Sequence, residues 1–382
     1  MRATVSRTLA EVDAAEWDAL IPRDDPHLRY GFLKAVEESG QGREPRYVQV
    51  FRAGTGELVA VAAAYGSPVD LLTLVPARWA RPFAALRRVA PKLLFLGSLT
   101  CGPAVTNCHP NLYVSPDLPD AESAAAAGLL IDTLENLPGV GPILLFFEFD
   151  AARAEQFEAP MTARGYIMAP SLPGTLLDIR WRSLPEYIGM LRKAFRRTVV
   201  KDREKAGNLE FEIVDDFSQY ADEVWKLYHN VLARAENVFE RLTPEFFRAL
   251  AGFEQSRIVL ARDRESRRIV GMELLLCGDS VIQDLYTGID YTYDADARLY
   301  FNLVYPVIGF AGEKGYRCLS LGQTSYDFKA RIGATPYPTF LFVRHRNALI
   351  HKLLLPFKSA LFPATPTVTR HVFREPSEAE NG

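Results

Sequence analysis

Two acidic residues on neighbouring predicted strands are the strongest candidates for acid–base chemistry. A turn-like pair, Gly278–Asp279, separates the strand-like stretches Ile269–Leu276 and Val281–Thr287. With this pair as a two-residue loop, Glu273 lies directly across from Asp284, and both side chains share one face. Facing carboxylates repel, so the pKa of one is raised, and the pair can supply a general base near neutral pH. The structural alternatives are a local arginine that neutralises the pair, or a register slip of one residue.

A polar segment after the next predicted strand supplies a second set of candidates. Gln323–Gly333 follows a buried strand-like run, where α/β folds gather functional side chains. Lys329 and Tyr326 are three residues apart and therefore share a helical face. Lys329 could stabilise charge that develops on a carbonyl oxygen or hold a phosphate, and Tyr326 could protonate a leaving group. The structural alternative is a solvated helix whose basic side chains extend to water.

A basic run near the middle of the chain could bind an anionic partner. Seven Lys and Arg residues between positions 192 and 205 stand against two acidic ones. On a helix, Arg192 and Arg196 fall near one stripe, opposite an apolar stripe. Such a face could hold the phosphates of a coenzyme, the acidic surface of a carrier protein or a tRNA. A solvated amphipathic face is the alternative.

The elements around these residues repeat one plan in the two halves of the chain. Each half reads as a hairpin, a helix, a buried strand, a short helix and a strand, and the first half carries an extra irregular stretch near 73–117 that we interpret as an insertion. The predicted fold class is α/β, with two tandem domains, each a mixed, mostly antiparallel sheet flanked by helices. We predict an N-terminal domain at 1–181, a C-terminal and catalytic domain at 182–345, and an extension at 346–382 whose last residues are disordered.

Composition limits the class of protein. The chain has 382 residues, of which 48% are hydrophobic and 24% charged, with a net charge of −3, typical of a soluble globular protein. The four cysteines form no CxxC and have no histidine at metal-binding distance in sequence, so we predict no metal site. We see no signal peptide and no apolar run of bilayer length, and therefore expect a cytoplasmic location without a transmembrane segment. Sequence motifs of dinucleotide oxidoreductases, P-loop NTPases, serine hydrolases and zincins are absent.

Four stretches resemble the Fem-like branch of the GNAT acyltransferase superfamily, whose members carry two GNAT-type folds in tandem. Tyr30–Gly40 is similar to the family's FLxALExSG opening, and Leu191–Ala206 is similar to its basic RRxxxKAxxxG helix. Leu285–Asp290 is similar to its YxxGxD strand end, and Leu299–Gly333 is similar to its helix–strand–YxxKxxxG segment. The matches touch both halves and are dense only across about 190–345. The resemblance implies two tandem GNAT-like domains that transfer an activated acyl or aminoacyl group to an amine, forming an amide.

The resemblance also implies roles for individual residues. Lys329 matches the family's lysine near the acyl carbonyl or the donor phosphates, and Asp290 matches the aspartate of YxxGxD. The basic helix matches the segment packed beside the donor groove. With Asp290, the candidates for substrate or donor binding are Tyr286, Gln323, Arg331, Arg192, Arg196, Arg197 and His229. The catalytic candidates are Glu273, Asp284, Lys329 and Tyr326.

The chain departs from the family at the donor loop. Coenzyme-A-binding GNAT proteins have a glycine-rich pyrophosphate loop where this chain has Asp294–Leu299, with no glycine and two carboxylates that would repel a pyrophosphate. This favours a carrier-protein thioester or an aminoacyl-tRNA over free acyl-coenzyme A. We expect no tightly bound cofactor, a small-molecule amine acceptor, and a donor carried on phosphopantetheine (carrier protein or coenzyme A) or on tRNA.

Two alternatives remain open. The first is a Fem-type, aminoacyl-tRNA-dependent peptidyltransferase; many of these carry a long helical hairpin for tRNA, whereas here strand-like Phe211–Val214 separates the predicted helices at 185–206 and 217–235. The second is a non-catalytic GNAT-fold adaptor that binds a carrier protein or peptide. A solvent-connected carboxylate pair beside Lys329, in a cleft between the halves, would favour the enzyme. Burial of the pair in a closed core would favour the adaptor.

Overall fold

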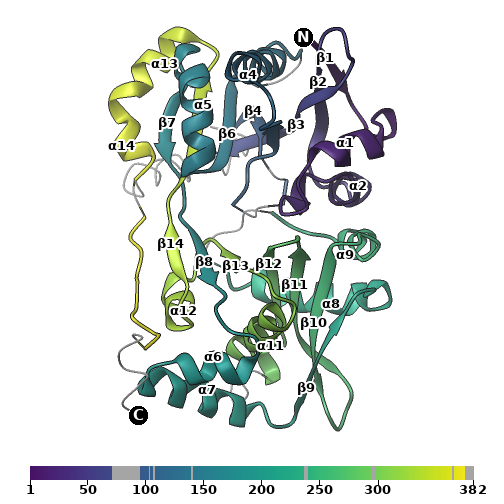
Figure 1. The fold of residues 1–382 in the computed structure, drawn as a ribbon, viewed down its shortest axis with the longest axis vertical. Helices are drawn as coiled ribbons and strands as arrows, with labels where there is room; N and C mark the ends of the chain where they lie inside the picture. The colour runs from purple at the N-terminus through teal and green to yellow at the C-terminus, as the bar shows by residue number, and fades with distance from the viewer. Residues whose placement is uncertain are drawn as a thin grey trace, which may run out of the picture.

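The computed structural model describes residues 1–70, 95–102, 104–105, 108–138, 141–235, 240–293, 298–363 and 365–374. It contains two twisted sheets, drawn one above the other in Figure 1, each flanked by helices. The first sheet has, in spatial order, β1 (Arg2–Ser6), β2 (Arg43–Phe51), β3 (Leu58–Asp70), β4 (Phe95–Cys101), β6 (Ile143–Asp150), β15 (Thr339–His345) and β7 (Ile167–Pro170), with β5 (Leu112–Val114) paired to β3. The second has β14 (Thr335–Tyr337), β8 (Gly174–Asp178), β13 (Cys318–Gly322), β12 (Val281–Ile289), β11 (Ile269–Cys277), β10 (Ser256–Asp263) and β9 (Leu209–Val214).

Within the described residues, each sheet has one parallel pair of neighbours, β4 with β6 and β12 with β13, and the other pairs are antiparallel. The predicted α/β class with two mixed, mostly antiparallel sheets is therefore confirmed. The helices that flank the sheets are α1 (Ala14–Leu20), α2 (Tyr30–Glu38), α4 (Asp120–Glu135), α5 (Ala151–Ala163), α6 (Leu184–Met190), α7 (Lys193–Lys205), α8 (Ala221–Leu232), α9 (Pro244–Leu250), α11 (Leu299–Glu313) and α12 (Tyr326–Arg331). Two short helices, α13 (Ala348–Leu354) and α14 (Lys358–Leu361), follow the last strand. In the described part of the chain, no helix combines the length and the apolar character needed to cross a bilayer.

Local signals explain where several helices begin. The Asp13 side chain accepts hydrogen bonds from the N–H groups of Ala15 and Glu16 and so caps α1. At α6 a capping box is present: Ser183 accepts from the Glu186 N–H, and the Glu186 carboxylate accepts from the Arg182 N–H. These side chains satisfy N–H groups that the first helical turn leaves without a partner.

The basic helix begins later than its apolar stripe predicts. The stripe from Leu184 to Val199 predicts one helix, whereas α6 ends at Met190 and α7 begins at Lys193. At the break, Leu191 forms a β-bridge with Phe373, and the Arg192 N–H donates to the Val372 carbonyl. The C-terminal segment thus supplies a partner for the backbone where the helix is interrupted.

The two sheets exchange strands across the boundaries predicted for the domains. Strand β8 lies within the predicted range 1–181 but pairs with β13 and β14 of the second sheet. Strand β15 lies within the predicted range 182–345 but pairs with β6 and β7 of the first sheet. Each sheet therefore contains a strand from the other half of the chain. The segments linking β7 to β8 and β14 to β15 are the crossovers visible in Figure 1.

The irregular stretch predicted near 73–117 contributes to the first sheet. Residues 71–94 lie outside the described residues, but β4 pairs with both β3 and β6, and β5 pairs with β3. Part of this stretch is therefore an inner strand of the sheet.

Candidate active site

The central cavity opens where β12 and β13 separate. These strands pair over three residues only, from Val281 with Cys318 to Gln283 with Ser320. The next residues, Asp284 and Leu321, line a cavity of about 500 Å³, a volume within the usual range for small-molecule sites. Its other lining residues include Cys108, Tyr228, Arg234, Glu240, Glu273, Tyr286, Thr287, Tyr291, Tyr300, Gln323, Thr324, Ser325, Phe328 and Lys329. Cys108 comes from the first half of the chain, so both halves contribute to the cavity.

The β11–β12 hairpin turns one residue later than predicted. Gly278 pairs with Val281 through an N–H···O hydrogen bond of 2.8 Å, so the loop is Asp279–Ser280. Asp24 holds this turn by accepting hydrogen bonds from the Ser280 N–H and the Ser280 hydroxyl. A Cβ atom at position 278 would lie 2.4 Å from the Asp24 Oδ1 atom, which explains why a glycine allows this contact.

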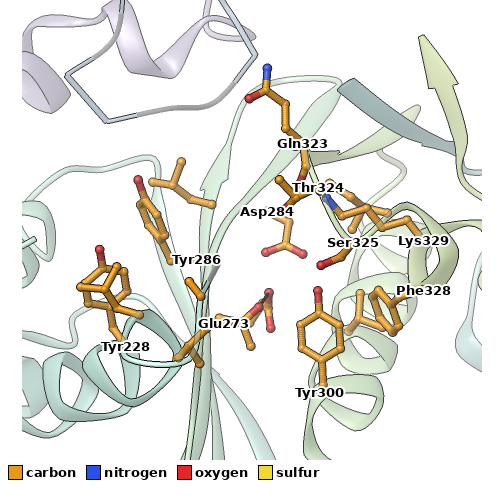
Figure 2. A pocket seen from close by; sticks show the side chains of 18 of the residues that line it. Tyr228, Glu273, Asp284, Tyr286, Tyr300, Gln323, Thr324, Ser325, Phe328 and Lys329 are labelled. Carbon is orange, nitrogen blue, oxygen red and sulfur yellow. Dashed lines mark hydrogen bonds between the residues drawn. The ribbon is translucent and has the colours of Figure 1, made fainter. Parts of the chain in front are cut away.

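This turn moves the strand register by two residues, and a bulge moves it again. The turn pairs Asp284 with Leu275. Leu285 is then an extra residue in β12, and beyond this bulge Glu273 pairs with Thr287. Side chains alternate between faces with a period of two, so a two-residue displacement leaves Glu273 and Asp284 on the same face. Figure 2 shows the two carboxyl groups pointing toward each other. The Thr287 hydroxyl donates to Glu273 Oε1 at 2.6 Å.

Burial and mutual repulsion perturb both carboxyl groups. Glu273 is 3% exposed, whereas Asp284 is half-buried. Burial, followed by the negative charge of Asp284, raises the pKa of Glu273 well above its ordinary value. Burial also raises the pKa of Asp284, but a hydrogen bond with Glu273 and the charge of Lys329 oppose that rise. Because the pKa of Glu273 is the more strongly raised, we assign the shared proton to Glu273 and regard Asp284 as the member of the pair that ionises first.

Lys329 places a cation beside this pair. It lies on α12, is 5% exposed, and donates from Nζ to the Gln323 carbonyl at 2.6 Å. Burial lowers the pKa of Lys329 to about 8, and the negative charge of Asp284 is the main effect that opposes this shift. The ammonium form therefore predominates at neutral pH and is lost in the mildly alkaline range.

Strained backbone gathers around the cavity. Cys108, Thr324 and Ser325 are non-glycine residues with φ values of 67°, 63° and 48°, and all three line the cavity. The buried Glu148 has a φ of 68°, and its carboxylate accepts from the Cys108 N–H at 3.0 Å. Such left-handed conformations are costly for non-glycine residues and cluster at functional sites. Their concentration here supports a functional role for this cavity.

The structure brings together some of the sequence-predicted candidates. Glu273, Asp284, Lys329, Tyr286 and Gln323 all line the cavity. The Tyr286 hydroxyl donates to the Glu240 carboxylate, and the Gln323 side chain points away from the carboxylate pair in Figure 2.

Other candidates lie outside the cavity lining. The Tyr326 hydroxyl donates to the Pro173 carbonyl at 2.9 Å. Asp290 pairs with Arg268 at 2.8 Å, and Arg331 pairs with Asp327 at 2.6 Å. His229 is exposed and stacks on Trp225. Three basic candidates lie at or after the break before α7 and are absent from the cavity lining: Arg192, Arg196 and Arg197.

Several cavity residues escaped the sequence analysis. Tyr300 lies in the first turn of α11, and its hydroxyl points toward the carboxylate pair in Figure 2. The sequence feature that could have identified Tyr300 is its position directly after the donor-loop region. Cys108 gave no signal, because only the packing of the two halves brings it to the cavity. Of the donor-loop stretch itself, residues 294–297 lie outside the described residues; Arg298 forms an ion pair with Asp202 at 3.4 Å.

One group of side chains in the described part of the chain has the composition of a metal site. Potential ligand atoms of Asp25, His27 and His109 all lie within 4.8 Å of one another. Arg153 donates to the Asp25 carboxylate and lies 3.0 Å from His109 Nδ1. The charge that balances this carboxylate is therefore an arginine side chain, and we assign the group a structural role. Burial would raise the pKa of Asp25, but the charges of Arg153 and then of the two histidines lower it to about 2.

The buried histidines make stability sensitive to acid. Burial lowers the pKa of His109 from 6.5 to about 4, against the opposing charge of Asp25. Between about pH 6.5 and about pH 4 the unfolded chain therefore binds more protons at this residue, so the free energy of unfolding falls as pH falls. We expect this fall to be smaller in His109→Gln than in the unsubstituted protein by about 2–3 kcal/mol, measured by urea unfolding across that pH range. His229→Gln, at an exposed histidine, is the matched control, and identical pH dependence in all three proteins would contradict the assignment.

Comparisons with known proteins agree with this architecture. Residues 190–330 match the family model described as an acetyltransferase (GNAT) domain, a range that includes Glu273, Asp284 and Lys329. The sequence of this chain matches no curated protein. Among solved structures, FemX has a TM-score of 0.60 at 12% identity, over 93% of this chain and 100% of that chain.

Two further structures share the fold. The C-terminal domain of a putative lysylphosphatidylglycerol synthetase from Agrobacterium fabrum has a TM-score of 0.54 at 13% identity, over 94% of this chain and 100% of that one. A conserved protein of unknown function from Bacteroides thetaiotaomicron has a TM-score of 0.54 at 11% identity, over 90% of this chain and 99% of that one. At these identities the likeness is one of fold. The GNAT match covers residues 190–330, and the fold shared with FemX extends over most of the chain.

Proposed function

We propose that this protein is an N-acyltransferase that moves an activated acyl or aminoacyl group from a carrier to a small-molecule amine, forming an amide. The observation that carries the proposal is the pair Glu273 and Asp284, which lines an open cavity beside the buried Lys329. Groups with perturbed pKa values concentrate at functional sites, and a base and a cation in one cavity suit acyl transfer better than binding alone.

The reaction would proceed by direct attack. The amine nitrogen forms a bond to the donor carbonyl carbon, and Asp284 accepts a proton from that nitrogen. The Lys329 ammonium group stabilises the negative charge on the carbonyl oxygen in the tetrahedral intermediate. The bond from this carbon to the donor sulfur or oxygen then breaks, and Tyr300 donates a proton to the leaving atom. The proton that Asp284 took up returns to Tyr300, so both side chains regain their starting state. Glu273 keeps the proton that it shares with Asp284, so the pair remains a single base.

Phosphopantetheine thioesters, on a carrier protein or coenzyme A, are the donor class that we propose. The exposed basic face of α7 (for example Arg197) would meet the acidic surface of a carrier protein. The second candidate donor is an aminoacyl-tRNA, which the sequence resemblance to Fem-like proteins implies. Strand β9 separates α7 from α8, so these two helices do not form a helical hairpin of the kind proposed for tRNA binding.

A binding experiment tests this function before the substrates are known. The purified protein is mixed with coenzyme A, with a phosphopantetheinylated carrier protein and with total aminoacyl-tRNA at one ionic strength, and thermal unfolding is followed. A donor present at about 100 times its dissociation constant stabilises the folded state by about 2.7 kcal/mol. We expect one donor to raise Tm in the unsubstituted protein and in Arg331→Ala, and to lose this effect in Lys329→Ala. Failure of every donor to change Tm would contradict the proposal.

A further inference from the structure

The segment after the last strand exposes large apolar side chains at unusual density. Leu349 is 73% exposed and Leu353 is 70% exposed, and Ile350 and Leu355 are also exposed. All four fall within seven consecutive residues. Elsewhere in the described part of the chain, the large apolar side chains that are exposed are Met1, Val5, Val200 and Val368. A contiguous exposed apolar patch on a soluble domain marks an interaction surface more often than chance exposure.

The local structure directs this patch outward. The Asn347 side chain caps α13 by accepting from the N–H groups of Leu349 and Ile350. Leu349 and Leu353 are four residues apart and share one face of α13. His351 lies on the opposite face, where its Nδ1 accepts from the His345 N–H of β15 at 3.3 Å. The helix is therefore fixed to the first sheet by one face and presents leucines on the other.

The same segment is basic. From Arg346 to Arg374 the sequence contains five Lys or Arg residues and no Asp or Glu, in a chain whose net charge is −3. Of these cations, Lys352 and Lys358 are exposed; Lys352 lies within the apolar stretch in sequence, and Lys358 follows it. Figure 1 shows α13 and α14 along the side of the first sheet, next to β7.

We propose that α13 and α14 dock the protein on an anionic lipid surface, with Leu349 and Leu353 inserted among the lipids and Lys352 and Lys358 near the phosphates. Apolar side chains bordered by lysines on an interfacial helix are the chemistry that such a surface recognises. A second copy of this chain fits less well, because a two-fold contact through this patch would bring the lysines of both copies onto one surface. None of these four residues lines the cavity at β12 and β13.

Vesicle co-sedimentation tests the proposal. The full chain is incubated with vesicles of phosphatidylcholine, with or without phosphatidylglycerol, at one ionic strength. We expect binding to vesicles that contain phosphatidylglycerol at least about tenfold tighter than to phosphatidylcholine alone. The double variant Leu349→Ser/Leu353→Ser and the double variant Lys352→Glu/Lys358→Glu should each weaken that binding by about tenfold or more. Since all four side chains are exposed, Tm should not change.

The matched control replaces an exposed apolar residue elsewhere. Val200→Ser, at a valine 42% exposed on α7, should bind vesicles as the unsubstituted protein does. Absence of vesicle binding, or equal binding by all variants, would overturn the proposal. A concentration-dependent dimer that only the leucine variant loses, without vesicle binding, would overturn it in favour of a second copy. None of these outcomes depends on acyl transfer, so the test is independent of the proposed activity.

Discussion

Replacement of Asp284 by asparagine is expected to lower kcat/KM for acyl transfer by about 10²- to 10⁴-fold, the usual contribution of a positioned general base. The asparagine keeps the size of the side chain and removes its ability to accept a proton from the attacking amine. Asp284 is half-buried and lines the cavity directly after β12 and β13 separate, so it is the member of the pair that an acceptor can reach. Amide formation with the donor identified by binding measures the effect.

Two further variants separate a role as base from a general effect of charge. Asp279→Asn changes an exposed carboxylate in the turn of the same hairpin, paired with Arg23, and should leave kcat/KM within about twofold. Glu273→Gln should fold well, because burial already favours a neutral side chain at this position. It should lower activity by altering the proton affinity of Asp284. Folded Asp284→Asn and Glu273→Gln proteins with full activity would rule out the carboxylate pair as the base.

Replacement of Lys329 by methionine is expected to lower kcat/KM by about 10²- to 10³-fold, because the developing oxyanion loses its cation. Because the pKa of Lys329 is lowered to about 8, the activity of the unsubstituted protein should fall as pH rises through about 8. Lys329→Met should lack this alkaline decline, since the group that deprotonates has been removed. A pH–rate profile of both proteins measures the two effects together.

The control for this variant is Arg331→Ala, which removes an exposed cation from the same short helix. Arg331 pairs with Asp327 and lies outside the cavity lining, so the variant should keep both the rate and the alkaline decline. A Lys329→Met protein with an unchanged rate would exclude Lys329 from catalysis. A reduced rate with an unchanged alkaline decline would assign that decline to another group.

Most individual elements could be predicted from hydrophobic periodicity and turn residues. The predicted hairpin strands and the helix predicted at 217–235 agree with β11, β12 and α8 to within a few residues. The exchange of β8 and β15 could not be predicted, because local periodicity shows that a strand forms but does not identify its partner. The break at Leu191 escaped prediction for a related reason: its cause, a bridge to Phe373, comes from the distant C-terminal segment.

The candidate site was predictable to the extent that it depends on local sequence. Glu273 and Asp284 were placed on one face although the predicted register was wrong, since an error of two residues preserves the alternation of a strand. The tyrosine of the cavity was harder to select: Tyr326 has the helical spacing to Lys329, but its hydroxyl donates to the Pro173 carbonyl, while Tyr300 lines the cavity. Cys108 could not be found, because it reaches the site only through the packing of two halves that are far apart in sequence.

The central claim is that Asp284, with Glu273 and Lys329, catalyses amide formation in this cavity, and product analysis tests it most directly. The unsubstituted protein and Asp284→Asn are incubated with each thioester and aminoacyl-tRNA donor and a panel of small amines, and products are identified by mass spectrometry. We predict an amide from one donor class, formed at least about 100-fold more slowly by Asp284→Asn. Donor hydrolysis without any amide, or equal amide formation by both proteins, would contradict the account.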